Sequence, residues 1–140
     1  MIATGYQDSS VTQNITTGAF FEGNSSVVSA TGNPPAPGTG FFMVLTAEDK
    51  YGNPIENYQF KIDIVVNNSD ATNSEYIRYG NQNHTVSASD VQPLPNLTDN
   101  TGKSYIPFQW GSNGDSGDST EIVWKDKDGN SIFTPTTVNY

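Results

Sequence analysis

Acidic residues gather in two stretches of the chain where they could bind a metal ion. Asp126, Asp128 and Asn130 alternate within one predicted turn, and Asp115 and Asp118 lie in another. Calcium takes six to eight oxygen ligands, often from carboxylates in loops of this kind. The first stretch lacks the downstream bidentate Glu of an EF-hand, so a plain hairpin turn is the default interpretation and a calcium site that joins the two acidic loops is the alternative. If calcium binds, we expect Asp126 and Asp128 as ligands, together with Asp115 or Asp118.

A second pattern suggests a protease and is outweighed by the rest of the chain. Gly114-Asp115-Ser116-Gly117 matches the string around the nucleophilic serine of trypsin-like proteases. That mechanism needs a His general base held by a buried Asp, and the only His is His84, in a predicted polar loop. A single His without any Cys also disfavours a transition-metal site. We therefore expect an exposed His84, an acidic loop over residues 112–119 and no enzymatic activity.

Composition excludes further classes of partner. Fifteen Asp and Glu against six Lys and Arg give a formal charge of −9, whereas binding nucleic acid or an anionic membrane requires a basic face. The chain has no Cys and therefore no disulfide. No run approaches the roughly 20 apolar residues of a membrane span, and the N-terminus lacks the regions of a secretory signal. We expect either a complete product starting at Met1 or a cloned fragment to which Met1 was added.

Short strands are the elements that must position these residues. Phe41–Ala47 and Tyr58–Val66 alternate apolar and polar residues, the period of strands that are exposed on one side. Ser104–Trp110 and Thr120–Lys125 show the same alternation, and Lys125–Asn130 has the Asp-Gly signal of a hairpin turn. Tyr76–Tyr79, Thr85–Ala88, Ser131–Thr134 and Thr136–Tyr140 are further predicted strands. Because no window keeps a helical period, the chain is predicted to be all-β, an antiparallel β-sandwich.

The first 40 residues read as an arm, and residues 41–140 as the sandwich. The arm contains one or two short strands and a kink at Asn33–Gly40, where three Pro and two Gly forbid a helix or a central strand. Its adjacent Phe20 and Phe21 either anchor the arm in a neighbouring subunit, as aromatic hot spots do, or pack on their own sandwich. Tyr6 and Tyr140 are the other interface candidates. Trp110 and Trp124 are expected in the core rather than on an exposed platform for glycans.

Two turns about half a domain apart carry a family resemblance. The first is Glu48-Asp49-Lys50-Tyr51-Gly52-Asn53-Pro54, and the second is Leu97-Thr98-Asp99-Asn100-Thr101-Gly102-Lys103. Together they resemble the bacterial immunoglobulin-like domain of the invasin and intimin group, which carries an "Asp…Gly-Asn-Pro" turn early and a "Thr-Asp…Gly" turn late. The resemblance implies an immunoglobulin-like fold and a role in display, spacing or adhesion, without catalytic residues.

Two functions follow as expectations. The first is a structural protein of a bacteriophage virion, a decoration or accessory protein that binds capsid or tail proteins. The second is a bacterial or archaeal adhesin or filament subunit at the cell surface, assembled from copies of itself by donor-strand exchange. In the second case surface glycans are expected partners, and the sequons at Asn14, Asn24, Asn67, Asn83 and Asn96 would be glycosylated. A glycosidase is the weakest alternative, because the acids lie mostly in turns rather than facing a cleft.

Overall fold

The computed structural model describes residues 17–30, 36–67, 76–79, 82–85, 91–112, 114 and 116–140. This part of the chain contains one short 3-10 helix and nine strands. Their bounds are η2 (Glu22–Asn24), β1 (Ser26–Ser29), β2 (Gly40–Thr46), β3 (Lys61–Asn67), β4 (Tyr76–Tyr79), β5 (Gln82–Thr85), β6 (Gln92–Pro93), β7 (Lys103–Trp110), β8 (Ser119–Lys125) and β9 (Thr136–Asn139). A search of these residues finds no helix with the length and apolarity that crossing a membrane requires.

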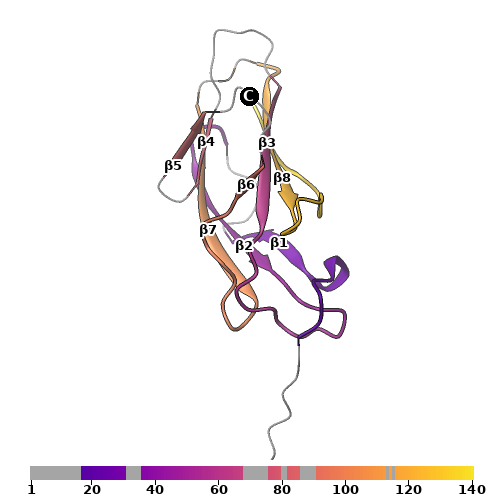
Figure 1. Ribbon diagram of the computed structural model, residues 1–140. Coiled ribbons are helices and arrows are strands. Elements are labelled where there is room, and N and C mark those ends of the chain that lie inside the picture. The colour runs from indigo at the N-terminus through magenta and orange to yellow at the C-terminus, as the bar shows by residue number, and fades with distance from the viewer. Residues whose placement is uncertain are drawn as a thin grey trace, which may run out of the picture.

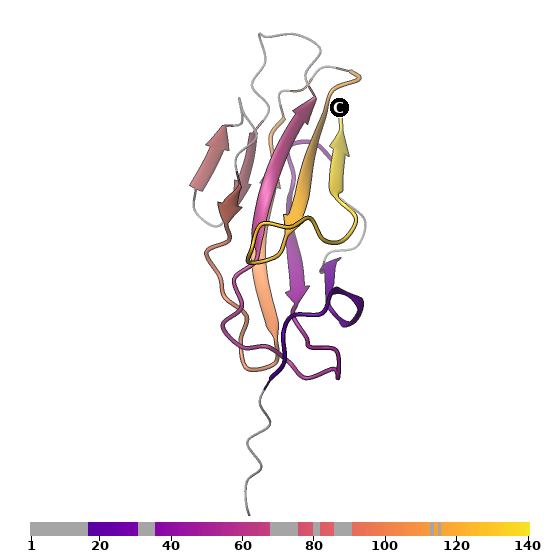
Figure 2. The same ribbon diagram turned by 45° about the vertical axis from the view of Figure 1, so that its right-hand side comes forward.

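The strands form two antiparallel sheets that face each other (Figures 1 and 2). One sheet has the order β1-β2-β7-β4-β5, and the other has the order β6-β3-β8-β9. Immunoglobulin domains pair strands A-B-E-D in one sheet and C-F-G in the other. In this chain, the order β1-β2-β7-β4 corresponds to A-B-E-D, and the order β3-β8-β9 corresponds to C-F-G. The predicted immunoglobulin-like β-sandwich is therefore confirmed.

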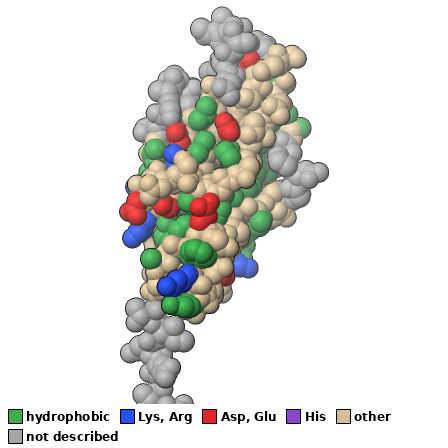
Figure 3. All heavy atoms as spheres, turned by 90° about the vertical axis from the view of Figure 1, so that its right-hand side faces the viewer, with side chains coloured by type: hydrophobic (Ala, Val, Ile, Leu, Met, Phe, Trp, Pro, Cys, Tyr) green, Lys and Arg blue, Asp and Glu red, His purple; other side chains and the backbone are tan. Residues whose placement is uncertain are grey.

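The outer face of the four-stranded sheet carries charged residues together with Val65 and Val123, as expected for strands with one solvated side. Asp63 lies opposite Val123, Val65 lies opposite Glu121, and Lys61 lies opposite Lys125. Figure 3 views the molecule from the side on which β3 and β8 lie, and charged side chains of both signs appear close together there.

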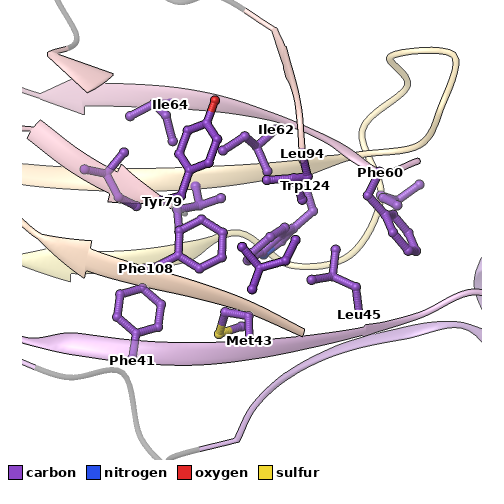
Figure 4. Packing of buried hydrophobic residues seen from close by; sticks show 14 of the residues in the cluster. Phe41, Met43, Leu45, Phe60, Ile62, Ile64, Tyr79, Leu94, Phe108 and Trp124 are labelled. Atoms are coloured by element: carbon purple, nitrogen blue, oxygen red, sulfur yellow. The ribbon is translucent and has the colours of Figure 1, made fainter. Parts of the chain in front are cut away.

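Apolar side chains from both sheets meet between the layers (Figure 4). β2 contributes Phe41, Met43 and Leu45, which are all at most 3% exposed. Trp110 of β7 and Trp124 of β8 are both fully buried, as the sequence predicts for core residues. Phe108 stacks on Phe41 with ring centroids 5.5 Å apart and meets Trp124 edge to face at 5.7 Å. Aromatic contacts of this kind join the two sheets into one core.

Part of the predicted arm belongs to the sandwich. β1 lies within residues 1–40 and pairs with β2 over its whole length, from Ser26 opposite Thr46 to Ser29 opposite Met43. Residues 1–16 and 31–35 lie outside the described residues, so the arm itself stays a prediction.

Two short strands differ from their predicted ranges. The predicted strand Ser131–Thr134 is replaced by a single bridge at Ser131 and a bend, because Phe133 has a φ of 57°, a value outside the β region. The predicted strand Thr85–Ala88 appears as β5, three residues earlier, and residues 86–90 lie outside the described part. The polar loop predicted around His84 is therefore corrected to a strand, in which His84 pairs with Ile77.

Candidate functional site

Three copies of one five-residue turn contain most of the acidic residues that the sequence singles out. They are Asp49–Asn53, Asp99–Lys103 and Asp126–Asn130. In each turn, Oδ1 of the first Asp accepts hydrogen bonds from the backbone N–H groups of the third and fifth residues. The fourth residue is Gly, with φ between +77° and +88°, a conformation that glycine adopts without steric penalty. The pattern Asp-x-x-Gly therefore encodes a locally complete hairpin turn.

The Asp126 turn, where calcium is predicted, is closed by its own donors. Asp126 Oδ1 accepts from the N–H groups of Asp128 and Asn130, at 2.9 Å each, and its Oδ2 accepts from the Asn130 side chain at 3.1 Å. Burial raises the pKa of Asp126, but the donors of Asn130 and Asp128 outweigh it and hold that pKa below its ordinary value. Asp128 is exposed at the tip of the turn.

The second predicted acidic loop is far from the first. Asp118 and Asp126 flank β8 at its two ends, and an extended strand of that length separates them by about 25 Å. One ion therefore cannot bind both, and Asp115 lies outside the described residues. Within the described part of the chain, no three His, Cys, Asp or Glu side chains form a group suited to a metal ion. Calcium bound by Asp126 and Asp128 in their own turn stays a prediction.

The first residue of the Asp49 turn is buried and contacts the segment that precedes β1. Asp49 is 1% exposed, and its Oδ2 accepts hydrogen bonds from the N–H of Gly18 at 2.9 Å and from the Asn53 side chain at 3.0 Å. Its carbonyl oxygen accepts from the Asn24 side chain at 3.0 Å. The Gly18 N–H, followed by the donors of Asn53 and Tyr51, lowers the pKa of Asp49 to about 2. The carboxylate therefore holds Gly18 on the sandwich, and the backbone carbonyl of the same residue holds Asn24.

The adjacent aromatic residues of that segment have different surroundings. The ring of Phe20 stacks on Tyr58 with centroids 4.9 Å apart and meets Phe60 edge to face at 5.8 Å. Of the two predicted roles, Phe20 therefore has the second, which is packing on its own sandwich. Phe21 is 46% exposed and stays a candidate contact. Its backbone N–H donates to the Glu48 carbonyl at 2.8 Å.

The other two interface candidates are Tyr140 and Tyr6. Tyr140 is partly buried against the core, and its hydroxyl donates to the Gly111 carbonyl at 3.0 Å. Its ring lies so close to Gly114 that a Cβ there would overlap with it. Tyr140 therefore serves its own fold, whereas Tyr6 lies outside the described residues.

A cluster of exposed apolar side chains, which the sequence analysis did not identify, covers the outer face of the five-stranded sheet. Phe42 is 52% exposed, Tyr105 is 54% exposed and Val28 is 52% exposed. Strand register places them together: Val28 lies opposite Val44, Val44 lies opposite Tyr105, and Phe42 lies opposite Pro107. We call Val28, Phe42, Val44, Tyr105 and Pro107 the outer patch. Contiguous apolar surface of this kind marks interaction sites on soluble domains.

A hollow of about 330 Å³ opens at one end of the outer patch. Its lining residues are Gly40, Phe41, Phe42, Arg78, Pro107, Phe108 and Gln109. Gln109 of β7 lies between Gly40 of β2 and Arg78 of β4 in one row across the sheet. The missing side chain at Gly40 leaves the row open, and the exposed Arg78 supplies a cation beside apolar walls. The hollow therefore combines apolar contact with a charged hydrogen-bond donor.

The outer patch escaped sequence reasoning for a physical reason. Alternation along β2 and β7 shows which residues point outward, but it gives no exposed fraction and no neighbours across strands. One signal was available in the sequence. Phe42, Val44 and Tyr105 are apolar at outward positions of their strands, whereas outward positions of β3 and β8 include Asp63, Glu121 and Lys125.

The remaining sequence candidates are described only in part. Ser116 is exposed in a turn next to Gly117, whose N–H donates to the Tyr140 carbonyl at 3.1 Å. The side chain of His84 lies outside the described part. Asn24 and Asn96 donate their side-chain amides to the carbonyls of Asp49 and Tyr105.

No protein-family model and no curated protein matches this chain. Among solved structures, it is similar to a conjugative transposon lipoprotein from Bacteroides eggerthii, at 14% identity and a TM-score of 0.47, covering 84% of this chain and 98% of the other. It is also similar to residues 27–141 of a conjugate transposon protein from Bacteroides vulgatus, at 12% identity and a TM-score of 0.39, covering 91% and 92%.

These neighbours overturn the first functional expectation. They are conjugative transposon proteins and not virion proteins, so the prediction of a phage decoration or accessory protein is wrong, and so is the virion location. The donor-strand adhesin or filament subunit is not supported by them either and is withdrawn. The alternative prediction, an extracellular or cell-surface location, agrees with the description of one neighbour as a lipoprotein. The resemblance to invasin-type domains stays a prediction. At these TM-scores the neighbours assign no activity to this chain.

Proposed function

We propose that this chain is a non-catalytic immunoglobulin-like module of the cell surface that binds another protein through the outer patch. The observation that carries the proposal is the contiguous row Val28, Val44 and Tyr105, with Phe42 and Pro107 beside it. Half-exposed aromatic side chains on a flat face are typical anchors of protein interfaces.

The rigidity of the patch supports the proposal. Phe42 and Tyr105 alternate along their strands with Phe41, Met43 and Ile106, which lie in the core. Because the two central strands pair over seven residues, from Gly40 opposite Gln109 to Thr46 opposite Lys103, the exposed side chains keep fixed positions. A partner therefore meets a surface that loses little conformational freedom on binding.

The composition of the other sheet also supports the outer patch as the binding surface. The four-stranded sheet presents Lys61, Asp63, Glu121 and Lys125 around Val65 and Val123 on its outer face. Charged residues are depleted in the centre of protein interfaces, and aromatic residues are enriched there. The five-stranded sheet has the composition of an interface, and the four-stranded sheet has that of an ordinary solvated surface.

Site-specific photo-crosslinking in the organism that encodes the chain tests this proposal. A benzophenone amino acid replaces Phe42 in one variant and Val123, at the centre of the opposite outer face, in a matched variant. We expect the variant at position 42 to give one crosslinked protein partner that the variant at position 123 does not give. Adding Tyr105→Ser to the position 42 variant should reduce that adduct at unchanged expression.

Two results would overturn the proposal. Equal adducts at positions 42 and 123 would show unspecific proximity, and no protein adduct at position 42 would show that the outer patch faces solvent in the cell.

A further inference from the structure

The turn Asp126–Asn130 contains an Asp-Gly pair that the proposed function does not use. Asp128 is exposed, and Gly129 follows it with a φ of +88°. The space beside Gly129 is open, because a Cβ built on it would meet nothing within 4 Å. The pair therefore lies accessible to solvent in the loop between β8 and β9 (Figure 2).

The carboxylate of Asp128 differs from the carboxylates that begin the three turns. Oδ1 of Asp49, of Asp99 and of Asp126 each accepts two backbone N–H groups, and these bonds hold the side chain in one orientation. Among the described residues, none donates a hydrogen bond to the carboxylate of Asp128. This carboxylate can therefore rotate toward the peptide bond that follows it.

The residue that follows each Asp makes the same distinction. The Asp residues that begin the turns are followed by residues with a Cβ, namely Lys50, Asn100 and Lys127. Asp128 is followed by a glycine, and Asp128-Gly129 is the only Asp-Gly pair in the chain. A glycine has no Cβ to hinder its backbone nitrogen, and it adopts unusual backbone angles without steric penalty. The nitrogen of Gly129 is therefore the least hindered nucleophile beside any Asp of these turns.

We propose that Asp128 is a site of spontaneous isomerisation to isoaspartate. The backbone nitrogen of Gly129 attacks Cγ of the protonated Asp128 carboxyl group, so that an N–Cγ bond forms and a Cγ–O bond breaks. The amide proton and the hydroxyl group leave together as water, and a cyclic imide remains. Water then opens the imide, either at Cγ, which restores Asp, or at the backbone carbonyl of Asp128, which leaves the chain connected through Cβ and Cγ. The water released is taken up again, so the product has an unchanged mass.

One hydrogen bond opposes this reaction. The N–H of Gly129 donates to the Asp126 carbonyl at 3.1 Å, and this bond must open before the nitrogen can attack. It lies in an exposed turn, so it opens by a local motion that leaves the core intact. We expect the reaction to be roughly fivefold slower in the folded chain than in the unfolded chain, the effect of one net backbone hydrogen bond.

The product would alter the turn in a defined way. The main chain gains an atom between Asp128 and Gly129, so the N–H of Asn130 is displaced from Asp126 Oδ1, to which it donates at 2.9 Å. The bond from the Asp128 N–H to the same oxygen precedes the insertion and can persist. The change is confined to one end of β8, and the inference does not depend on the outer patch.

Prolonged incubation of the full chain under native conditions tests the proposal. Peptide mapping with electron-transfer fragmentation distinguishes isoaspartate from aspartate and gives the fraction of isoaspartate at each Asp. We expect isoaspartate to accumulate at Asp128 and to stay at background at Asp49, Asp99 and Asp126. Isoaspartate formed from Asn113, which also precedes a glycine, is recognised separately because deamidation changes the mass.

Three variants locate the reaction. Asp128→Glu keeps the charge but requires a larger ring, so the isomerised product at this position should disappear. Gly129→Ala keeps the Asp and adds a Cβ to the nucleophile, so the fraction of isoaspartate should fall severalfold. Gly52→Ala, which also places a side chain at positive φ, +81°, is the matched control and should leave the fraction at Asp128 unchanged.

The same mapping on the chain in denaturant shows whether the folded turn permits the reaction. Isoaspartate at Asp128 in the denatured chain and none in the folded chain would show that the turn protects the pair, which overturns the proposal. Equal fractions at Asp128 and Asp99 would show that neither the unbonded carboxylate nor the glycine selects the site. A fraction that Gly129→Ala leaves unchanged would also contradict the proposed nucleophile.

Discussion

The turns Asp49–Asn53 and Asp126–Asn130 share their Asp-x-x-Gly-Asn pattern and their internal hydrogen bonds, yet only the first of them begins with a buried Asp. Asp49 is 1% exposed and accepts an additional hydrogen bond from Gly18, 31 residues earlier. Asp126 is only partly buried and bonds within its own turn. The local code therefore forms both turns, and the surroundings decide which one holds distant parts of the chain together.

The largest expected effect is the loss of the buried carboxylate. Asp49→Ala removes the acceptor of the N–H groups of Gly18, Tyr51 and Asn53, so three backbone donors lose their partner at once. We expect the Tm to fall by roughly 10 °C, measured by thermal unfolding. The matched Asp126→Ala should lower it by about 2 °C, since water can replace the carboxylate there. Equal losses would show that the surroundings of Asp49 add nothing.

A smaller effect separates two glycines at the fourth position of the turns. Gly102→Ala and Gly129→Ala both place a side chain at positive φ, +77° and +88°. At Gly102 the new Cβ would also lie 2.7 Å from the Ala47 carbonyl oxygen, whereas at Gly129 it meets nothing within 4 Å. We expect losses of about 2 kcal/mol and about 1 kcal/mol respectively, measured by urea unfolding. A larger loss at Gly129 would contradict the crowding argument.

The smallest expected effect is a dependence on pH. The pKa of Asp49 is about 2 in the folded chain and 3.8 in the reference state. A lowered folded pKa stabilises the fold fully above pH 3.8, and this stabilisation disappears as the pH falls from 3.8 toward 2. Between these values the Tm of the wild type should fall more steeply than that of Asp49→Asn. Parallel curves for the two proteins would show that Asp49 is not the group that titrates.

Much of the fold could be predicted because its determinants are local. Alternation along Phe41–Ala47 and Ser104–Trp110 identifies inward residues without knowledge of the pairing, and an Asp-Gly pair identifies a turn within five residues. The prediction of a strand at Ser131–Thr134 was wrong because one residue, Phe133, adopts a positive φ. Composition does not reveal such a φ angle.

The candidate site could not be predicted, because register and not local sequence assembles it. Gly40, Gln109 and Arg78 come from three strands that are far apart in the sequence and become neighbours only through the pairing β2-β7-β4. The bond from Gly18 to Asp49 is hidden in the same way. Patterns along one strand contain no information on which strand lies beside it.

The strands of the two sheets also differ in the charge that they carry. The strands of the five-stranded sheet contain Arg78 and Lys103 and no Asp or Glu, whereas β3 and β8 contain residues of both signs. The first set of strands therefore adds positive charge to a chain whose net charge is −9. An approaching partner senses this difference only at short range, because the Debye length is about 8 Å at physiological ionic strength.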